Sequence, residues 1–526
     1  MMTNTFPKTD LATHDVTNQA EGFEGVSLYE SDPRLAAWLR GRTDEAQREQ
    51  IEAFGQTLGR HESWQLAEQA NRFPPELATF DRSGRRLDEV RYHPAYHELM
   101  RLGCEAGVAS LAWRSGSGGH QAHAALEYML IQVEPGVCCP LTMSYAGAPV
   151  LAQSPELADF HERLITPSYD ASSRPWQDKR AVTLGMAMTE KQGGSDLRQT
   201  QTRAERCADG YRLTGHKWFC SAPMSDAFLM LAQTAEGLSC FWVPRWQPDG
   251  QRNGIELQRL KDKLGNRANA SSEIELQRAY GILIGEPGRG IATILEMVHH
   301  TRLDCAVAAA GLMRQAVVRA IHHARQRQAF GKALIEHDLM ARVLAAIDLE
   351  AEAATLLSLR AAELCDAGPS PLARLGVAIA KYWNNKRCPL VVAEAMEALG
   401  GAGYIEASVM PRLYKEAPLN GIWEGSGNVI CLDILRTTRR LPEVVDALRN
   451  ELGAQGESVL EWLPSAEPAD ARALAGQLAR AWQRSLLERH SVPGAAQHLS
   501  SAVGAFGECF PVAGAGARLR ASLPEL

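Results

Sequence analysis

Glu424 stands in a short run whose residue types suit proton-transfer chemistry. The run reads Leu-Asn-Gly-Ile-Trp-Glu-Gly-Ser-Gly-Asn over residues 419–428, and a helical pattern follows it. A carboxylate beside a large aromatic ring can have a raised pKa, and the backbone amides of a glycine-rich turn can polarise a carbonyl. The same run also fits a helix start, with Glu424 near the positive end of the helix dipole and Ser426 as N-cap. The local sequence therefore leaves two interpretations open, a general base or a capped helix N-terminus.

Two further segments could hold a flat cofactor that carries phosphate. Residues 186–196 leave an apolar run through a Gly-Gly turn, where free backbone amides and the Ser195 hydroxyl can bind phosphate or a ring edge. Residues 217–221 place Trp218 beside Ser221 at the end of an expected strand, where the indole can stack on a cofactor. The plainer interpretations are a surface β-turn and a core tryptophan. The sequence contains neither G-x-G-x-x-G nor the P-loop motif, which argues against those nucleotide sites.

Arginines mark two other places. Arg327 ends a long helical pattern, where it can pair with a phosphate or simply complement the helix dipole. Arg436, Arg439 and Arg440 cluster at the end of a later helical pattern. Beyond them, residues 441–526 hold seven Arg, no Lys and ten Asp or Glu, a net charge of −3. A nucleic-acid tail normally has a clear basic excess, so charge alone gives a DNA surface little support.

The elements that must position these residues follow the order helices, strands, helices. Apolar residues recur at helical spacing within 44–72 and 93–133, whereas the first forty residues look irregular and residues 168–179 look like a linker. A hairpin signal at Asp209-Gly210 separates two strand-like runs, and further strand pairs follow it. The expected strands are residues 181–188, 202–206, 211–219, 228–233, 239–243, 255–257 and 273–276, and the later helices are 290–327, 339–365 and 372–399.

Composition sets outer limits on function. The chain has 526 residues, 45% of them apolar and 22% charged, with a formal net charge of −7, which is ordinary for a globular protein. No window approaches eighteen uninterrupted apolar residues and the start of the chain is polar, so we expect no membrane span and a cytoplasmic protein. The eleven cysteines lack metal spacing and are expected as reduced core thiols. The pairs His299-His300 and His322-His323 are expected to be structural, so no metal site is predicted.

Taken in sequence order, these segments resemble the landmarks of the flavin-dependent acyl-CoA dehydrogenases over roughly residues 180–436. The details are most similar to the AidB-like branch, which is linked to the response to DNA alkylation. The runs that carry the resemblance are residues 188–196, 218–221, 260–267, 327–331, 399–404 and 422–428.

The resemblance implies an α+β fold. It consists of an N-terminal helical domain (1–180), a middle antiparallel β domain (181–289), a C-terminal four-helix bundle (290–440) and an additional C-terminal helical domain (441–526). It also implies a homotetramer, with FAD between the β domain and the bundle and an acyl-CoA thioester as substrate.

By position, the resemblance implies that Glu424 is the catalytic base. Thr189 and Arg302, which stands twenty-five residues before Arg327, would contact the substrate. Arg327, Phe330 and Gly401 would reach the FAD of a neighbouring subunit. The implied flavin contacts are Met186, Ala187, Met188, Thr189, Glu190, Lys191, Gln192, Gly193, Gly194, Ser195, Trp218, Phe219, Cys220, Ser221, Ile422, Trp423, Gly425, Ser426, Gly427, Asn428, Val429, Ile430, Cys431 and Leu432.

Three functions follow from the resemblance. The first is an FAD-dependent acyl-CoA dehydrogenase for a short or branched acyl-CoA such as isovaleryl-CoA, with activity weakened if Trp423, where most of the family has Tyr, narrows the channel. The second is a flavoprotein with little turnover that binds double-stranded DNA and protects it from alkylation. It would use Arg436, Arg439, Arg440 and Arg518. The third is an acyl-CoA oxidase, which would produce peroxide directly.

Overall fold

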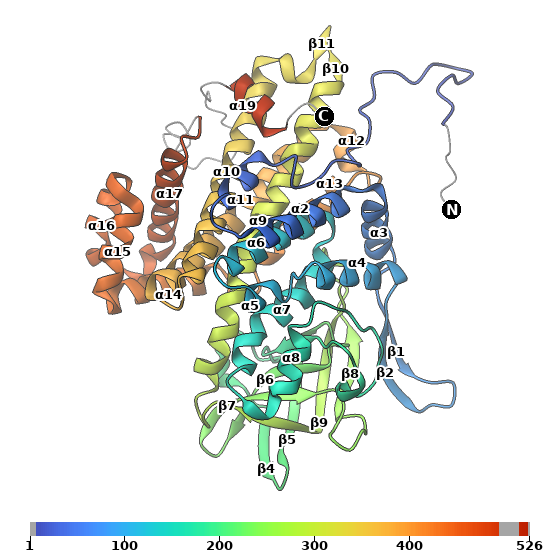
Figure 1. The fold of residues 1–526 in the computed structure, drawn as a ribbon, viewed down its shortest axis with the longest axis vertical. Helices are drawn as coiled ribbons and strands as arrows, with labels where there is room; N and C mark the ends of the chain where they lie inside the picture. The colour runs from blue at the N-terminus through green and yellow to red at the C-terminus, as the bar shows by residue number, and fades with distance from the viewer. Residues whose placement is uncertain (1–6, 494–514, 524–526) are drawn as a thin grey trace.

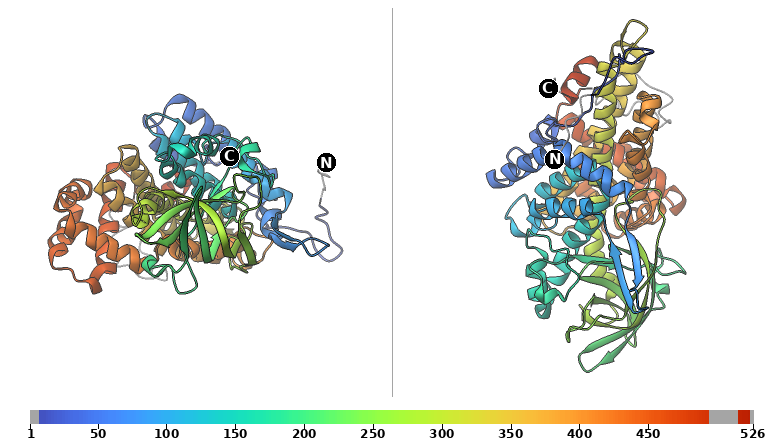
Figure 2. Two further views of the ribbon diagram at one scale, coloured as in Figure 1. Left: turned by 90° about the horizontal axis from the view of Figure 1, so that it is seen from below. Right: turned by 90° about the vertical axis from the view of Figure 1, so that its right-hand side faces the viewer.

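The computed structural model describes residues 7–493 and 515–523. Its longest element, the helix α9, runs from the β-sheet at one end of the molecule to a small hairpin at the other (Figure 1). The N-terminal helices pack along one side of α9, and the last helices of the chain lie on another side, away from the sheet (Figure 2). The order of helices, strands and helices expected from the sequence is confirmed.

The N-terminal part is helical, and it contains four elements that the sequence patterns did not indicate. These are α1 in the stretch expected to be irregular, the hairpin β1–β2 after the Pro74-Pro75 break, the buried helix α7 and the short helix α8. Because α7 is apolar on all sides, it has no amphipathic pattern. The elements are α1 (Pro33–Leu39), α2 (Glu45–Gly59), α3 (His61–Arg72), β1 (Glu76–Phe80), β2 (Arg86–Arg91), α4 (Pro94–Glu105), α5 (Leu111–Arg114), α6 (Gly119–Val133), α7 (Pro135–Leu151) and α8 (Ala158–Leu164).

The middle part is a seven-stranded sheet in the order β3-β6-β4-β5-β9-β7, with β8 added on β9. The turn at Asp209-Gly210 joins β4 to β5 as expected. The sheet is mostly antiparallel, but β3 runs parallel to β6, because the connection after β3 crosses over before the chain returns. The strands are β3 (Leu184–Ala187), β4 (Arg203–Cys207), β5 (Gly210–Ser221), β6 (Ala227–Thr234), β7 (Gly237–Pro244), β8 (Ile255–Leu260) and β9 (Ser271–Ile284).

The helical bundle follows. Its alanine-rich faces allow the helices to approach closely, and its interior belongs to one large core shared with the N-terminal helices. The helix α11 continues through Pro389. The elements are α9 (Gly290–Gln326), β10 (Gln328–Ala329), β11 (Lys332–Ala333), η4 (Leu334–Glu336), α10 (Asp338–Asp366), α11 (Pro371–Ala398), α12 (Gly401–Tyr404), α13 (Met410–Glu416), η5 (Leu419–Gly421) and α14 (Gly427–Arg440).

Additional helices close the described chain: α15 (Pro442–Leu452), α16 (Glu457–Trp462), α17 (Ala471–Arg489) and α19 (Ala515–Ser522). They extend the bundle, since Trp482 of α17 is fully buried and Gly476 lies against the Trp383 ring of α11. None of the described helices has the length and apolar character needed to cross a membrane. The ten cysteines among the described residues are free thiols, as expected.

Candidate active site

Glu424 lies in the turn between η5 and α14, in a left-handed backbone conformation. Its φ is +58° and that of Gly425 is +97°. A residue other than glycine costs about 1–2 kcal/mol in this region, so surrounding contacts must hold the turn. Ser426 takes the N-cap position of α14, although its side chain makes no capping bond. The helix-start interpretation therefore describes Ser426, while the Glu424 carboxylate contacts α9.

Two buried cations hold the turn from opposite helices. Lys381 of α11, which is 1% exposed, donates hydrogen bonds to the carbonyl oxygens on both sides of Glu424, at Trp423 (2.9 Å) and Gly425. Arg302 of α9 donates from Nε to the Glu424 carbonyl oxygen at 3.0 Å. These three bonds occupy the backbone oxygens of the turn and leave the carboxylate to a different partner.

That partner is Thr301, whose hydroxyl donates to Glu424 Oε2 at 2.7 Å. Burial raises the pKa of Glu424 above its usual value, while the Thr301 hydroxyl and the charges of Lys381 and Arg302 oppose that rise. Raising the pKa makes a carboxylate a stronger base once it is ionised. The arrangement therefore suits a general base, which agrees with one of the two interpretations of the sequence.

The other residues around Glu424 lie partly at the surface and partly in the core. The Trp423 indole donates to Asn420 Oδ1 at 2.7 Å, which fixes the ring beside Glu424. Asn428 accepts from Arg472 Nε of α17 at 2.6 Å. Ile430 and Cys431 are buried in the core, whereas Leu432 is half-exposed. The flavin contacts expected in this run stay a prediction.

A second wall of the site forms where β3 and β5 end. The backbone N–H of Trp218 donates to the Thr189 carbonyl oxygen at 2.8 Å, which joins the two predicted segments. The space around Gly193 is open, whereas a side chain at Gly194 would collide with Thr189. Phe219 is 48% exposed, although it is an aromatic residue within a strand. The structure thus brings together the glycine-rich turn and the aromatic strand end that the sequence indicated.

The side chains of several expected flavin contacts have structural roles. Glu190 forms a buried ion pair with Lys217 (2.8 Å) and accepts a hydrogen bond from the Thr202 hydroxyl (2.6 Å), so it anchors the glycine-rich turn to the sheet. The side chains of Met186, Ala187 and Cys220 lie in the hydrophobic core. Only the backbone of these residues can face a cofactor.

Cys139 belongs to this site, although the sequence gave no reason to select it. It lies on α7 close to Ser221 and Asn269, and it interacts electrostatically with Glu424. Burial raises the pKa of its thiol to about 12, so the group is neutral and acts as a small apolar wall. Cys139 also shows that the end of β5 and the Glu424 turn face the same space.

Cations surround the exposed aromatic end of β5. The Lys261 ammonium lies 3.2 Å from the centroid of the Trp218 ring, and Arg259 and Lys191 lie 5.7 and 5.6 Å from it. Neither Arg259 nor Lys261 was predicted to have a role, although their alternation along β8 and its loop places both on one face. Exposed aromatic rings with nearby cations suit a flat ring system that carries phosphates.

Comparison with known proteins agrees with this geometry. The sequence is 48% identical to AidB of Escherichia coli (strain K12) over 445 residues, which cover 83% of this chain and 82% of AidB. The chain belongs to the acyl-CoA dehydrogenase family. Residues 18–171 match the adaptive response protein AidB N-terminal domain, residues 185–279 the acyl-CoA dehydrogenase middle domain, and residues 288–438 its C-terminal domain.

A relative from Caenorhabditis elegans and two solved structures, one of them from the same organism, extend the comparison. Acyl-CoA dehydrogenase family member 11 is 32% identical, over 84% of this chain and 74% of that protein. The crystal structure of ACDH-11 in complex with C11-CoA matches with a TM-score of 0.81 at 26% identity, over 99% of this chain and 94% of that one. The apo-form of Bd2924 also matches with a TM-score of 0.81, at 28% identity, over 90% of this chain and 99% of that one.

FAD is the cofactor of this family, and the residues present fit it. The open turn at Gly193 leaves room for close approach, Trp218 and Phe219 offer aromatic surface, and Lys261 supplies positive charge near it. A flat ring and an anionic pyrophosphate need these three features. The residues therefore fit FAD by their chemical character.

Arg327 and Phe330 lie far from Glu424 within one chain. Arg302 and Arg327 are on or at the end of the same helix, and twenty-five residues of α-helix span roughly 38 Å at 1.5 Å per residue. Phe330 sits in the hairpin at the opposite end of α9 from the sheet (Figure 1). A flavin at Glu424 can therefore meet Arg327 or Phe330 only if they come from another chain.

Of the four expected DNA contacts, one is wrong. The Arg518 side chain is 1% exposed and forms ion pairs with Asp348 (2.8 Å) and Glu352 (2.6 Å), so it cannot reach a phosphate. Arg436 is 58% exposed and only 3.9 Å from Asp433. Arg439 is exposed but donates to the Ala466 carbonyl oxygen, and Arg440 is exposed.

Proposed function

We propose that the chain is an FAD-dependent acyl-CoA dehydrogenase in which Glu424 removes the α-proton of an acyl-CoA thioester. The observation that carries the proposal is the Glu424 carboxylate itself. It is partly buried, has a raised pKa, and lies on a turn that Lys381 and Arg302 hold through backbone oxygens. Family membership supports the reaction class.

Each residue then has a defined task. Glu424 takes the proton, and its backbone N–H, which follows the Trp423 carbonyl held by Lys381, is free to polarise the thioester oxygen. Cys139 and Trp423 would limit the access of water to the carboxylate, which would raise its basicity further. Bound FAD would supply the acceptor for the hydrogen that leaves the β-carbon with its electrons. Thr189 and Ser221 would contact that cofactor from the strand ends.

We propose a short or branched acyl chain such as the isovaleryl group for the substrate. Trp423 supports this assignment, because its ring is larger than the Tyr found in most of the family and is fixed by Asn420. The C11-CoA in the structure of ACDH-11 shows that a relative of this fold takes a longer chain. A series of acyl-CoAs of increasing length will locate the limit that Trp423 sets.

The site is proposed to be completed by further copies of the chain in a homotetramer. The hairpin β10–β11 presents Phe330, which is 97% exposed, and Tyr404 near Gly401 is 78% exposed. Large exposed aromatic groups of this kind mark interaction surfaces. Arg327, Phe330 and Gly401 are therefore proposed to contact the FAD of a neighbouring subunit.

The test is anaerobic mixing of the flavin-loaded protein with acyl-CoAs. The flavin absorbance band should fall with a short or branched acyl-CoA, and Glu424→Gln should abolish the change while the flavin stays bound. Glu406→Gln, at an exposed carboxylate on the surface, is the matched control and should behave as wild type. A band that stays constant with every acyl-CoA would refute the dehydrogenase proposal. Oxygen consumption with substrate would instead identify an oxidase.

DNA binding is the second candidate function, and the exposure of Arg436 favours it. Phosphate contacts release counterions, so binding of a duplex should weaken steeply with salt. Arg436→Ala should lower the salt slope by about 1. Arg278→Ala, at an exposed arginine on the β-sheet, is the control. An Arg436→Ala protein with unchanged affinity and slope would exclude this surface.

A further inference from the structure

The hairpin β10–β11, here called the arm (residues 327–333), is too small to be stable by itself. It pairs only Gln328 with Ala333 and Ala329 with Lys332, around a turn at Phe330-Gly331. Phe330 adopts a φ of +51° and is 97% exposed, so its side chain contributes almost nothing to holding the arm. Isolated two-stranded hairpins are marginal in water even when they are longer. Other parts of the chain must fix the arm.

The N-terminal segment contacts one side of the arm. Asn18 forms a reciprocal pair with Gln328, donating from Nδ2 to its carbonyl oxygen (2.9 Å) and accepting from its backbone N–H (2.7 Å). The Arg327 guanidinium donates to the Asn18 carbonyl oxygen. The backbone N–H of Glu21 donates to Gln326 Oε1 at 2.8 Å, at the last residue of α9. Residues more than three hundred positions apart are thus joined at the base of the arm.

The C-terminal helix α19 contacts the same base from another direction. Arg325 near the end of α9 donates from Nη2 to the Leu519 carbonyl oxygen at 2.9 Å. Leu519 and Leu523 are 2% and 1% exposed and belong to the main core. The helix is therefore packed into the bundle rather than lying loosely on its surface.

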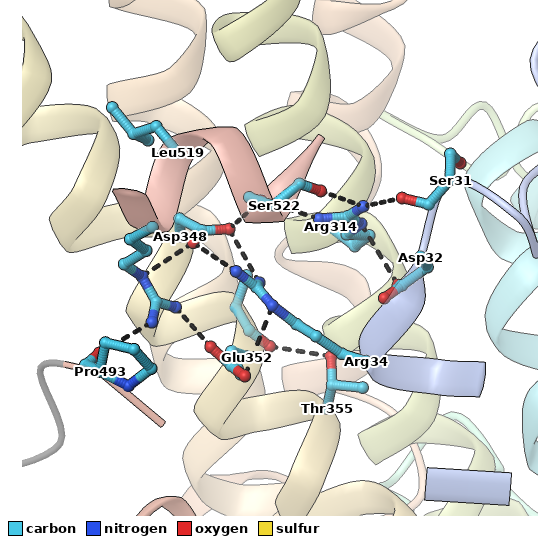
Figure 3. Close-up of polar contacts among 12 residues, drawn as sticks. Ser31, Asp32, Arg34, Arg314, Asp348, Glu352, Thr355, Pro493, Leu519 and Ser522 are labelled. Carbon is cyan, nitrogen blue, oxygen red and sulfur yellow. Dashed lines mark hydrogen bonds and ion pairs between the residues drawn. The ribbon is translucent and has the colours of Figure 1, made fainter. Parts of the chain in front are cut away.

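A buried group of charges, here called the terminal ion cluster, fastens α19 in place (Figure 3). The Arg518 guanidinium pairs with Asp348 and Glu352 of α10, and Arg34 pairs with the same two carboxylates. Arg314 of α9 donates to the Ser522 carbonyl oxygen (2.7 Å) and to the Ser31 carbonyl oxygen (2.7 Å). The cluster consists of Asp32, Arg34, Arg314, Asp348, Glu352 and Arg518, three acids and three arginines.

The cluster connects both ends of the chain to the helices that carry the arm. Ser31, Asp32 and Arg34 come from the start of the described chain, and Arg518 and Ser522 from its end. Buried charges are stable only when each has its partner, so removing one member releases the others as well. A disturbance at either terminus therefore reaches α9, α10 and the arm between them.

We propose that the two chain termini form a clamp that positions the arm, and that assembly and flavin retention depend on this clamp. The inference rests on the proposed function, in which Arg327 and Phe330 reach the FAD of a neighbouring copy. Asn18 and Arg518 are positioning residues in this scheme, since they act through the arm. The clamp sets where the arm projects, and the arm completes the neighbouring flavin site.

The test compares single substitutions at the two termini with one in the arm. Arg518→Met breaks the terminal ion cluster, Asn18→Ala removes the side-chain bonds to Gln328, and Phe330→Ala removes the arm's aromatic ring. Arg520→Ala, at an exposed position of the same helix α19, is the matched control. The measurements are molar mass by light scattering, the Kd for FAD by fluorescence, and far-ultraviolet circular dichroism.

We expect Arg518→Met, Asn18→Ala and Phe330→Ala to yield smaller assemblies and to raise the Kd for FAD at least about tenfold, a change of about 1.4 kcal/mol. Arg520→Ala should do neither. If Arg518→Met loses helical dichroism, Asn18→Ala decides, because Asn18 is exposed and its loss leaves the core intact.

Two results would overturn the inference in distinguishable ways. Unchanged assembly and FAD affinity in Arg518→Met and Asn18→Ala, with both lost in Phe330→Ala, would refute the clamp and leave the role of the arm standing. Unchanged behaviour in Phe330→Ala would remove the arm from the flavin site and the clamp with it. The Glu424 experiment would still test the dehydrogenase chemistry separately.

Discussion

Two groups of charge share the long helix α9, and they differ in what they do to a carboxylate. Around Glu424, the cations Lys381 and Arg302 bond backbone oxygens, and burial raises the pKa of the acid. In the terminal ion cluster, Arg34 and Arg518 bond the Asp348 carboxylate directly. Its pKa is lowered by those partners even though burial alone would raise it.

The difference separates a reactive acid from a structural one. A carboxylate with both oxygens bound by arginines is stabilised as an anion and has little reason to accept a proton. Glu424 has one hydroxyl donor and keeps an oxygen available, at a cost in folding free energy that the surrounding helices must offset. Proximity of arginine and carboxylate is thus no guide to function until the bonded atoms are known.

Among the changes that test this difference between the two carboxylates, the largest effect is expected on the rate of turnover. Glu424→Gln removes the base and should lower the rate of flavin reduction roughly 10²–10⁴-fold, the usual contribution of a positioned general base. The same change should leave the free energy of unfolding at neutral pH unchanged or slightly higher, because a neutral amide replaces an acid whose ionised form is disfavoured by burial. Stopped-flow absorbance and urea unfolding measure the two quantities. A variant that unfolds readily would place Glu424 with the structural acids.

The next largest effect is on the free energy of unfolding and should not involve the dehydrogenase reaction. Asp348→Asn removes one of the two carboxylates that Arg34 and Arg518 share, so unfolding should become easier by about 3–5 kcal/mol. Glu205→Gln, which breaks an exposed pair with Arg278 at 3.4 Å, should cost less than about 1 kcal/mol. Urea unfolding of both variants checks the prediction. Equal midpoints would show that the buried cluster contributes no more than a surface pair.

How much of the fold and of the site could be predicted from the sequence depends on how far apart in the chain the interacting residues are. The position of Glu424 follows from a short local run and from the order of the landmarks around it, and the structure brings that run to Thr301 and Arg302. The strands and long helices follow from periodicity that is visible within each segment. The fold class and family were therefore within reach of the sequence.

The roles of residues whose partners are distant in the chain could not be predicted from the sequence. Arg518 looks like a surface arginine in an alanine-rich stretch, and only its pairing with Asp348 and Glu352 on α10 makes it a core residue. Cys139 gives no local sign of its place between Ser221 and Glu424, because α7 is apolar on every side. Glu190 resembles part of a cofactor turn, but its partner Lys217 lies across the sheet.

A smaller effect should follow from loosening the Glu424 turn. Lys381→Met removes both donors to the carbonyl oxygens that flank Glu424, so the left-handed turn loses its fixed geometry. Turnover should fall about 10- to 100-fold, as expected when a base moves by a fraction of an ångström to an ångström. Lys386→Met, at an exposed lysine little more than one turn along α11, is the control. Equal loss in both variants would mean that lysine charge, rather than the two bonds, matters.

The smallest effect concerns pH. Thr301 donates to the ionised Glu424 carboxylate and so lowers a pKa that burial raises. Thr301→Val removes that donor, and a bond to a charged group contributes about 1.5–3 kcal/mol, or about one to two pKa units. Because the base is active only when ionised, the acid limb of the rate profile should move to higher pH by about that amount, while the rate well above it changes little.

Thr301→Ser keeps the hydroxyl and should keep the limb where it is. A limb that stays fixed in Thr301→Val would mean that Glu424 is not the group whose ionisation the profile reports. A limb that moves as far in Thr301→Ser, which keeps the hydroxyl donor, would mean that the hydrogen bond does not set the pKa of Glu424. The terminal ion cluster provides the contrast, since Asp348 has a lowered pKa and its ionised form is retained across the same pH range.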